Sequence, residues 1–285
     1  PDFGRIVAMM QFDMYHSYTV DEHTLKAIGI LHGIETGALC QAAPVATEVM
    51  PEIESRRALY VAMLLHDIAK GRGGNHSVLG AEVALVVCPR LGLSHEETET
   101  VSWLILHHLL MSKIAFRYDL NDPQTIEDFA SIVQSPERLK LLLVLTVADI
   151  RAVGPNIWNG WKAALMRDLY CSCDAVLRGA DPAVIALGNA EEARQEAATK
   201  LTDWDAARFA AHAVNMPLTY WTGFDCESQV RHARLCDQFA NQDALLLIDF
   251  KPDPGRRITE LTILTIDDPG LFARIASAVA AAGAN

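Results

Sequence analysis

The pattern of apolar and polar positions predicts helices over most of the chain. Apolar residues recur at helical spacing, in segments separated by glycine and proline. The expected helices cover residues 19–31, 55–70, 77–87, 94–109, 135–150 and 157–187. Thr19 and Ser94 each open a capping-box pattern, and Ser135 is followed by a proline that suits the first helical position. This pattern is typical of a helical bundle.

The periodicity changes towards the C-terminus. Residues 191–239 remain helical but are more polar, whereas residues 244–250 and 258–266 have the pattern of strands and residues 271–282 that of an amphipathic helix. A lone strand–helix unit cannot close a sheet. We therefore expect a mainly α fold: a helical bundle over residues 1–190, a helical connector over 191–242, and a truncated α/β segment over 243–285.

Composition and charge narrow the class of protein. Of the 285 residues, 51% are hydrophobic and 21% are charged, which suits a globular core. The longest apolar stretch, residues 139–148, is too short for a membrane span of about 20 residues, and no signal peptide is visible. The net charge of −12 argues against general nucleic-acid binding, and six scattered cysteines without a CxxC pair are typical of reduced thiols. We expect a cytoplasmic protein with neither a membrane nor a nucleic-acid partner.

Histidines and two aspartates are the candidate metal ligands. Imidazole nitrogens and carboxylate oxygens suit borderline divalent metals, and a helical bundle can bring them together. Eight of the ten histidines lie between residues 16 and 108. The candidates are His23, the doublet His66-Asp67, His76, the doublet His107-His108, and Asp149.

Asp149 is the sharpest of these candidates. It follows an apolar run near the end of its predicted helix, where burial and the negative end of the helix dipole both penalise a carboxylate. A nearby cation is therefore expected, although capping by a distant arginine or by backbone donors stays open.

His76 could equally be a solvated loop histidine. One of His107 and His108 could be a packing residue, because their side chains point about 100° apart.

The order His, His-Asp, His, His-His, Asp resembles the HD-domain superfamily of metal-dependent phosphohydrolases over residues 16–150. The resemblance implies one divalent ion held by four of the residues: His23, His66, Asp67 and Asp149. It also implies a second ion held by His76, His107 and His108, with Asp67 bridging the two ions, which would be Mn²⁺ or Mg²⁺. Asp67 and Lys70 are then the candidate catalytic residues, and Lys70 would stabilise developing charge or protonate a leaving oxygen. The alternative for Lys70 is a solvated cation at a helix end.

Residues 14–24, 66–71 and 158–162 more closely resemble the bifunctional uridylyltransferase/uridylyl-removing enzymes of nitrogen regulation. Residues 267–272 then resemble the start of an ACT domain, a ligand-sensing βαββαβ module. The resemblance implies hydrolysis of a UMP–tyrosine phosphodiester on the uridylylated PII signal protein, stimulated by glutamine. The nucleotidyltransferase motif of that family is absent from this sequence, so we expect no UMP transfer. With an incomplete ACT domain over residues 243–285, we also expect turnover that does not respond to glutamine.

Two further functions stay open on the sequence alone. One is an HD hydrolase of a free nucleotide, such as a dinucleoside polyphosphate or an alarmone. The second is a non-catalytic HD/ACT scaffold that only relays amino-acid sensing. Assays with UMP-protein and with free nucleotides separate the first from the uridylyl-removing function, and metal analysis tests the second.

Overall fold

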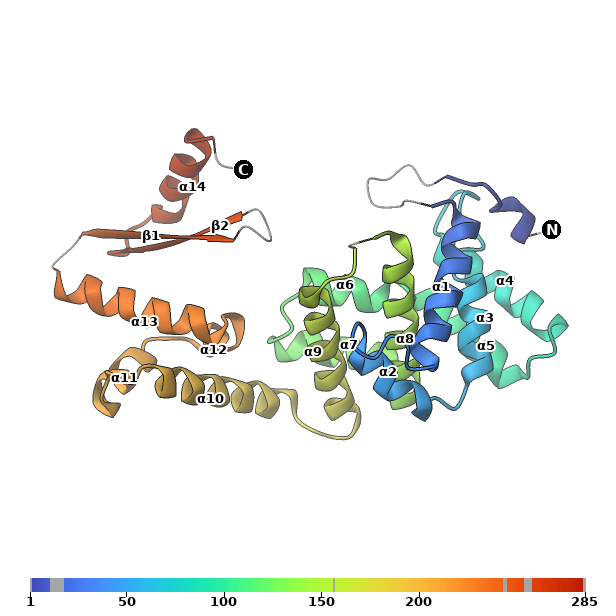
Figure 1. Cartoon of the computed structure of the whole chain (residues 1–285), viewed down its shortest axis with the longest axis horizontal. Helices are drawn as coiled ribbons and strands as arrows, with labels where there is room; N and C mark the ends of the chain where they lie inside the picture. Colours follow the sequence, from blue (N-terminus) through green and yellow to red (C-terminus); the bar gives the residue numbers. More distant parts are fainter. Residues whose placement is uncertain (1, 11–17, 156, 243–244, 254–257, 284–285) are drawn as a thin grey trace. The chain divides into compact units, whose positions relative to one another are not determined.

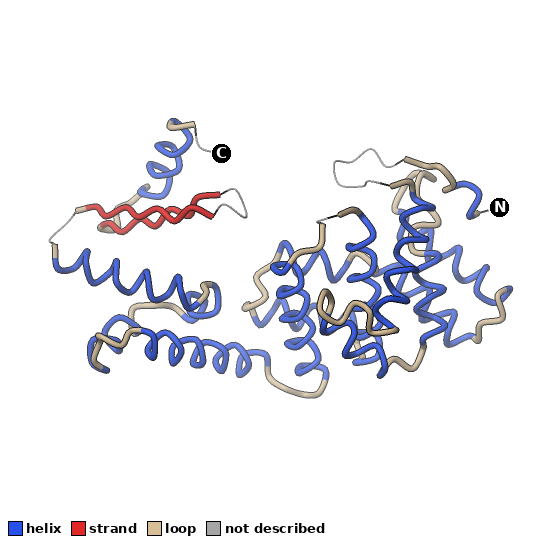
Figure 2. Tube along the Cα trace, in the orientation of Figure 1, coloured by secondary structure: helices blue, strands red, loops and turns tan. Residues whose placement is uncertain are grey.

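The computed structural model describes residues 2–10, 18–155, 157–242, 245–253 and 258–283. The chain is mainly helical, as the apolar pattern predicts, with a two-stranded sheet and one helix near its C-terminus (Figures 1 and 2). It divides into two compact units, Pro1–Ala186 and Leu187–Asn285. No helix among the described residues has the length and apolar character that a membrane span requires. Residues 14–17, part of one motif noted above, lie outside the described residues.

The first unit is an assembly of helices. Its elements are η1 (Phe3–Arg5), α1 (Val20–Glu35), α2 (Pro44–Val49), η2 (Met50–Glu52), α3 (Arg56–Leu65), α4 (His76–Arg90), α5 (His95–His107), α6 (Leu110–Arg117), α7 (Pro123–Val133), α8 (Pro136–Val153) and α9 (Gly160–Leu177). Helix α10 (Pro182–Lys200) includes the boundary between the units.

Helix α8 lies in the middle of the core of the first unit. Its residues 141–145 are at most 1% exposed, so the helix is buried on all sides along this stretch. It packs against α1, α2 and α9, while α5 packs against α3 and α4. The helices that carry the candidate ligands are therefore neighbours in one core.

The second unit combines short helices with a hairpin. Its elements are α11 (Ala206–Ala213), α12 (Leu218–Gly223), α13 (Cys226–Asn241), β1 (Leu246–Asp253), β2 (Ile258–Thr265) and α14 (Leu271–Ala281). The strands pair antiparallel, with Leu246 opposite Thr265 and Ile248 opposite Ile263. Both predicted strands and the final helix are thus present, whereas the assignment of this segment to an ACT domain stays a prediction.

Two predicted helices are wrong in their extent. The helix expected over residues 55–70 ends at Leu65, and residues 66–71 form turns that end at Gly71, where φ is +75°. The pattern over residues 157–187 suggested a single helix, but α9 ends at Leu177 and α10 begins at Pro182. Gly179 between them has a φ of +95°, which glycine adopts at low cost and which no helix contains. Pro182 then suits the first turn of the next helix, where no N–H donor is needed.

Candidate metal centre

Two histidines of the site stand directly after helix ends, and the same kind of hydrogen bond orients both. His66 follows α3 and His108 follows α5, each at the C-cap position. The Nδ1 atom of His66 lies 2.8 Å from the carbonyl oxygen of Met63, and that of His108 lies 2.7 Å from the carbonyl oxygen of Ile105. Because a carbonyl only accepts, Nδ1 is the donor, and a neutral ring then carries its lone pair on Nε2.

Asp67 is the shared member of the site. Its side chain is 2% exposed. Its Oδ2 atom lies 3.9 Å from Nε2 of His23 and 3.3 Å from Nε2 of His66. Its Oδ1 atom lies 3.7 Å from Nε2 of His76 and 3.9 Å from Nε2 of His108. One carboxylate thus faces two histidines through each of its oxygens.

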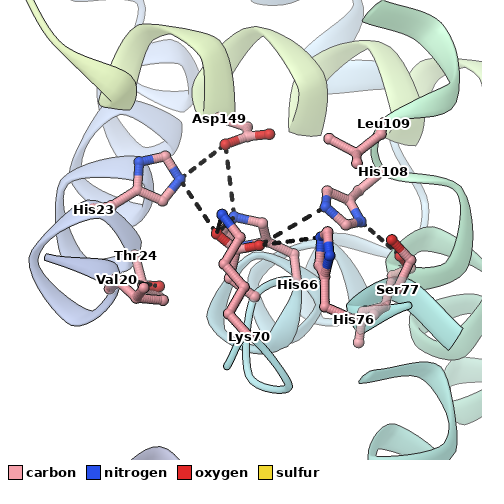
Figure 3. A network of polar contacts seen from close by, with 12 residues as sticks. Val20, His23, Thr24, His66, Lys70, His76, Ser77, His108, Leu109 and Asp149 are labelled. Carbon is pink, nitrogen blue, oxygen red and sulfur yellow. Dashed lines mark hydrogen bonds and ion pairs between the residues drawn. The ribbon is translucent and has the colours of Figure 1, made fainter. Parts of the chain in front are cut away.

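These atoms fall into two groups that have Asp67 in common. His23, His66 and Asp67 form one group, and Asp67, His76 and His108 form the other; within each group the ligand atoms lie within 4.8 Å of one another. The residues come from α1, from the turn after α3, from the start of α4 and from the end of α5. Figure 3 shows the labelled histidines converging from these separate elements.

Asp149 reaches the first group from α8. Its Oδ1 atom lies 2.9 Å from Nε2 of His23 and 3.6 Å from Nε2 of His66 (Figure 3). Burial would raise the pKa of Asp149, but the hydrogen bond with His23 and the nearby His66 imidazole hold it well below its usual range. Arg151, two residues further on, instead donates to the carbonyl oxygen of Ala42. The partners of this carboxylate are therefore histidines rather than the neighbouring arginine.

The polar atoms of the cluster fit a divalent metal ion. Among the described residues, His66 Nε2, Asp67 Oδ1 and His76 Nε2 are buried atoms without a hydrogen-bond partner. Leaving such an atom unsatisfied costs about 1–3 kcal/mol. Cations coordinated in the two groups would remove that cost, and two imidazoles with a carboxylate, the donors of each group, are of the kind that borderline divalent metals prefer.

Comparison with known proteins agrees with this geometry. Residues 20–152 match the model of the HD domain. This region is an HD domain. It contains every candidate ligand, from His23 in α1 to Asp149 in α8.

The similarity extends beyond the HD domain to the whole chain. The chain is 57% identical to the bifunctional uridylyltransferase/uridylyl-removing enzyme of Azospirillum brasilense, 51% to that of Rhodospirillum rubrum and 48% to that of Gluconobacter oxydans. Each match covers all of this chain and 30% of the relative. The chain therefore spans less than a third of the length of these relatives.

Lys70 and His76 form the more accessible edge of the cluster in the HD domain. The Nζ atom of Lys70 lies 2.7 Å from Oδ2 of Asp67, and the Lys70 side chain is 20% exposed. The His76 side chain is 27% exposed, against 1% or less for His23, His66 and His108. Lys70 and His76 are therefore the most exposed side chains of the cluster.

The balance of burial and charge shifts the pKa values of His66 and His108 in opposite directions. Burial lowers the pKa of His66, but the Asp67 and Asp149 carboxylates outweigh it and raise the pKa to about 10. For His108, burial and the charge of His66 dominate and lower the pKa to about 4. Without a metal ion, a protonated His66 thus balances part of the negative charge of the carboxylates.

The structure separates His107 from His108. The His107 ring lies 4.9 Å from the ring of Trp103. The guanidinium of Arg138 lies 4.9 Å from the Trp103 ring as well. His107 belongs to neither ligand group among the described residues. Of the two roles left open by the sequence, this geometry favours a packing role for His107.

The backbone acceptors of the HD domain were not among the residues predicted from the sequence. The carbonyl oxygens of Met63 and Ile105 fix which nitrogen of each ring faces Asp67. The available signal was a histidine directly after an apolar helix, since the last carbonyls of a helix lack intrahelical partners.

Proposed function

We propose that this HD domain is a metal-dependent phosphodiesterase that removes UMP from the uridylylated PII signal protein. The supporting observation is the convergence of four histidines on Asp67 in a chain that is 48–57% identical, over its whole length, to proteins named for uridylyl removal. The more general function, a metal-dependent phosphohydrolase, rests on the two ligand groups together with the match to the HD domain. The identity of the substrate rests on the relatives.

In this proposal two divalent ions, Mn²⁺ or Mg²⁺, occupy the two ligand groups. His23, His66, Asp67 and Asp149 would hold one ion, and Asp67, His76 and His108 would hold the other. Bound divalent ions polarise a phosphoryl oxygen and acidify water, so that a nucleophile is available at neutral pH. Asp67 belongs to both groups, so its loss would weaken both sites.

The remaining residues of the site orient and attract the substrate. The Met63 and Ile105 carbonyls hold the His66 and His108 rings with Nε2 towards Asp67. Lys70 brings a positive charge to the accessible edge, which attracts a phosphodiester anion although the chain carries a net charge of −12. From this edge the Lys70 ammonium can stabilise charge that develops on the leaving oxygen or donate a proton to it.

A substrate comparison tests this function. The purified chain, loaded with Mn²⁺, is incubated with UMP-PII, with a dinucleoside polyphosphate and with an alarmone, and released nucleotides are quantified. We expect UMP release from the protein substrate to be the fastest reaction. Faster hydrolysis of a free nucleotide would favour the alternative HD hydrolase, and metal binding without hydrolysis of any of them would favour a regulatory scaffold.

A further inference from the structure

Residues 2–10, here called the N-terminal arm, precede the region that matches the HD domain. The arm is fastened to the start of α1. The Ala8 N–H donates to the Asp21 carboxylate (3.1 Å), the Val20 N–H donates to the Met9 carbonyl (3.0 Å), and Met10 forms an antiparallel bridge with Thr19. These contacts lie within four residues of the ligand His23.

The arm also touches the turn that carries the HD doublet, residues 66–72, here called the HD turn. The Arg72 guanidinium donates to the Asp2 carboxylate (2.8 Å) and to the carbonyl of Ile68 (3.3 Å). Met9 packs against Gly71 so closely that a Cβ atom there would lie 2.5 Å from Cε of Met9. Gly71 also has a φ of +75°, which favours glycine.

The middle of the arm is anchored in the core. Ile6 is 0% exposed and belongs to the main hydrophobic cluster, against which Phe3 and Met9 also pack. The arm is thus held along its length rather than at one point. It connects the two elements that supply the first ligand group, α1 with His23 and the HD turn with His66 and Asp67.

We propose that the N-terminal arm is a clamp that fixes α1 relative to the HD turn, and that Arg72 is a positioning residue acting through this turn. The quantity it would control is the separation of His23 Nε2 and Asp67 Oδ2, which is 3.9 Å. The clamp follows from the contacts alone, whereas its consequence, tighter metal binding, rests on the proposed function. Neither Asp2 nor Arg72 is among the proposed ligands.

Mn²⁺ titration of two single variants separates the clamp from a plain charge effect. Removing the positive charge in Arg72→Gln would by itself strengthen cation binding, and removing the negative charge in Asp2→Asn would weaken it. The clamp predicts weaker binding in both. Residues that orient metal ligands change metal affinity about 10–100-fold; because Arg72 acts one contact further out, we expect a loss of about three- to tenfold. Tighter Mn²⁺ binding by Arg72→Gln would overturn the role of Arg72.

Two further variants complete the Mn²⁺ experiment. Arg57→Gln removes a comparable ion pair, with Glu97, from α3 in the same unit and should leave Mn²⁺ affinity within about twofold of wild type. The charge swap Asp2→Arg with Arg72→Asp should restore most of the affinity lost in the single variants. An equal loss in Arg57→Gln, or no recovery in the charge swap, would contradict the clamp.

Amide hydrogen exchange tests the clamp without any metal. In metal-free protein, Asp2→Asn and Arg72→Gln should accelerate exchange in residues 66–72 and 20–24, and Arg57→Gln should not. Unchanged exchange in both regions would overturn the clamp. If the wild-type protein binds no Mn²⁺ and the two variants still exchange faster, the clamp would be supported and the proposed metal function refuted.

Discussion

His66 and His108 follow different helices, yet they are held in the same way. Each ring donates from Nδ1 to the carbonyl three residues earlier and faces Asp67 through Nε2. The carbonyl is free to accept because the helix has just ended. A helix end thus supplies both the direction of the side chain and the tautomer that a metal ion requires.

Alanine substitution of His107 and His108 tests the site at the resolution of one residue. His108→Ala should weaken Mn²⁺ binding by at least about tenfold, because a proposed ligand is lost. His107→Ala, which removes a ring packed on Trp103, should change Mn²⁺ affinity by less than about twofold. Isothermal titration calorimetry measures both. The reverse order of effects would refute the assignment of these two residues.

Metal uptake should release protons. Asp67 and Asp149 outweigh the effect of burial and raise the pKa of His66 to about 10, so the metal-free ring is protonated at pH 7.5. Its Nε2 must lose that proton before it binds a cation, so Mn²⁺ affinity rises with pH below pH 10 and falls as the pH is lowered. Calorimetry in two buffers with different ionisation enthalpies should show release of about one proton per protein. Identical heats in both buffers would contradict a protonated His66.

At the scale of elements, the site depends on close contact between helices. Helix α4 begins at the proposed ligand His76, where the Asn75 side chain accepts from the Ser77 N–H (3.0 Å). One turn further on, Gly80 lets α4 approach α5. A Cβ atom there would lie 2.9 Å from Cγ2 of Ile105, the residue whose carbonyl orients His108. A side chain at position 80 would therefore press on Ile105, whose carbonyl orients the proposed ligand His108.

Two glycine-to-alanine substitutions test this contact. Gly29 lies exposed in α1, with open space where an alanine methyl group would stand, so Gly29→Ala should raise the free energy of unfolding by about 0.5–1 kcal/mol. At Gly80 the same gain in helix propensity is opposed by the contact with Ile105, so Gly80→Ala should stabilise less or destabilise. Urea unfolding in the presence of a chelator measures both. Equal stabilisation by the two variants would show that α4 and α5 are not in close contact.

Much of this arrangement could be predicted from the sequence, because local signals dominate most helices and both strands. The capping box of Ser94 with Glu97 is formed as predicted at the start of α5. The break between α9 and α10 could not be predicted from apolar periodicity, which continues through Gly179. Among the candidate ligands, the sequence could not separate His107 from His108. Which of the two side chains faces Asp67 depends on how α5 packs in the core.

At the scale of the whole molecule, the HD domain lies within the first unit, and the hairpin with α14 belongs to the second. Each unit has a hydrophobic cluster of its own; that of the second includes Ala190, Ala197 and Trp221. The chain spans 30% of the length of its relatives. An effector bound in the second unit would therefore act on a domain that has its own core.

The response to glutamine is the corresponding prediction. An effector changes activity only if it binds two states of the protein with different affinity. The described part of the expected ACT segment is one hairpin and one helix, and we expect no such binding difference. Hydrolysis of UMP-PII by this chain should therefore proceed at the same rate with and without millimolar glutamine. A severalfold activation would place the glutamine site within these 285 residues.

The most direct test of the proposed metal centre is release of UMP from UMP-PII, measured with the wild-type chain and with Asp67→Asn. Chelation should abolish release by the wild-type chain, and Mn²⁺ or Mg²⁺ should restore it, because the histidines and Asp67 act through bound cations. Asp67→Asn should lose at least about 100-fold in turnover under the same conditions, since both ligand groups share this carboxylate. Undiminished release in the chelator, or by Asp67→Asn, would contradict a metal centre built on Asp67.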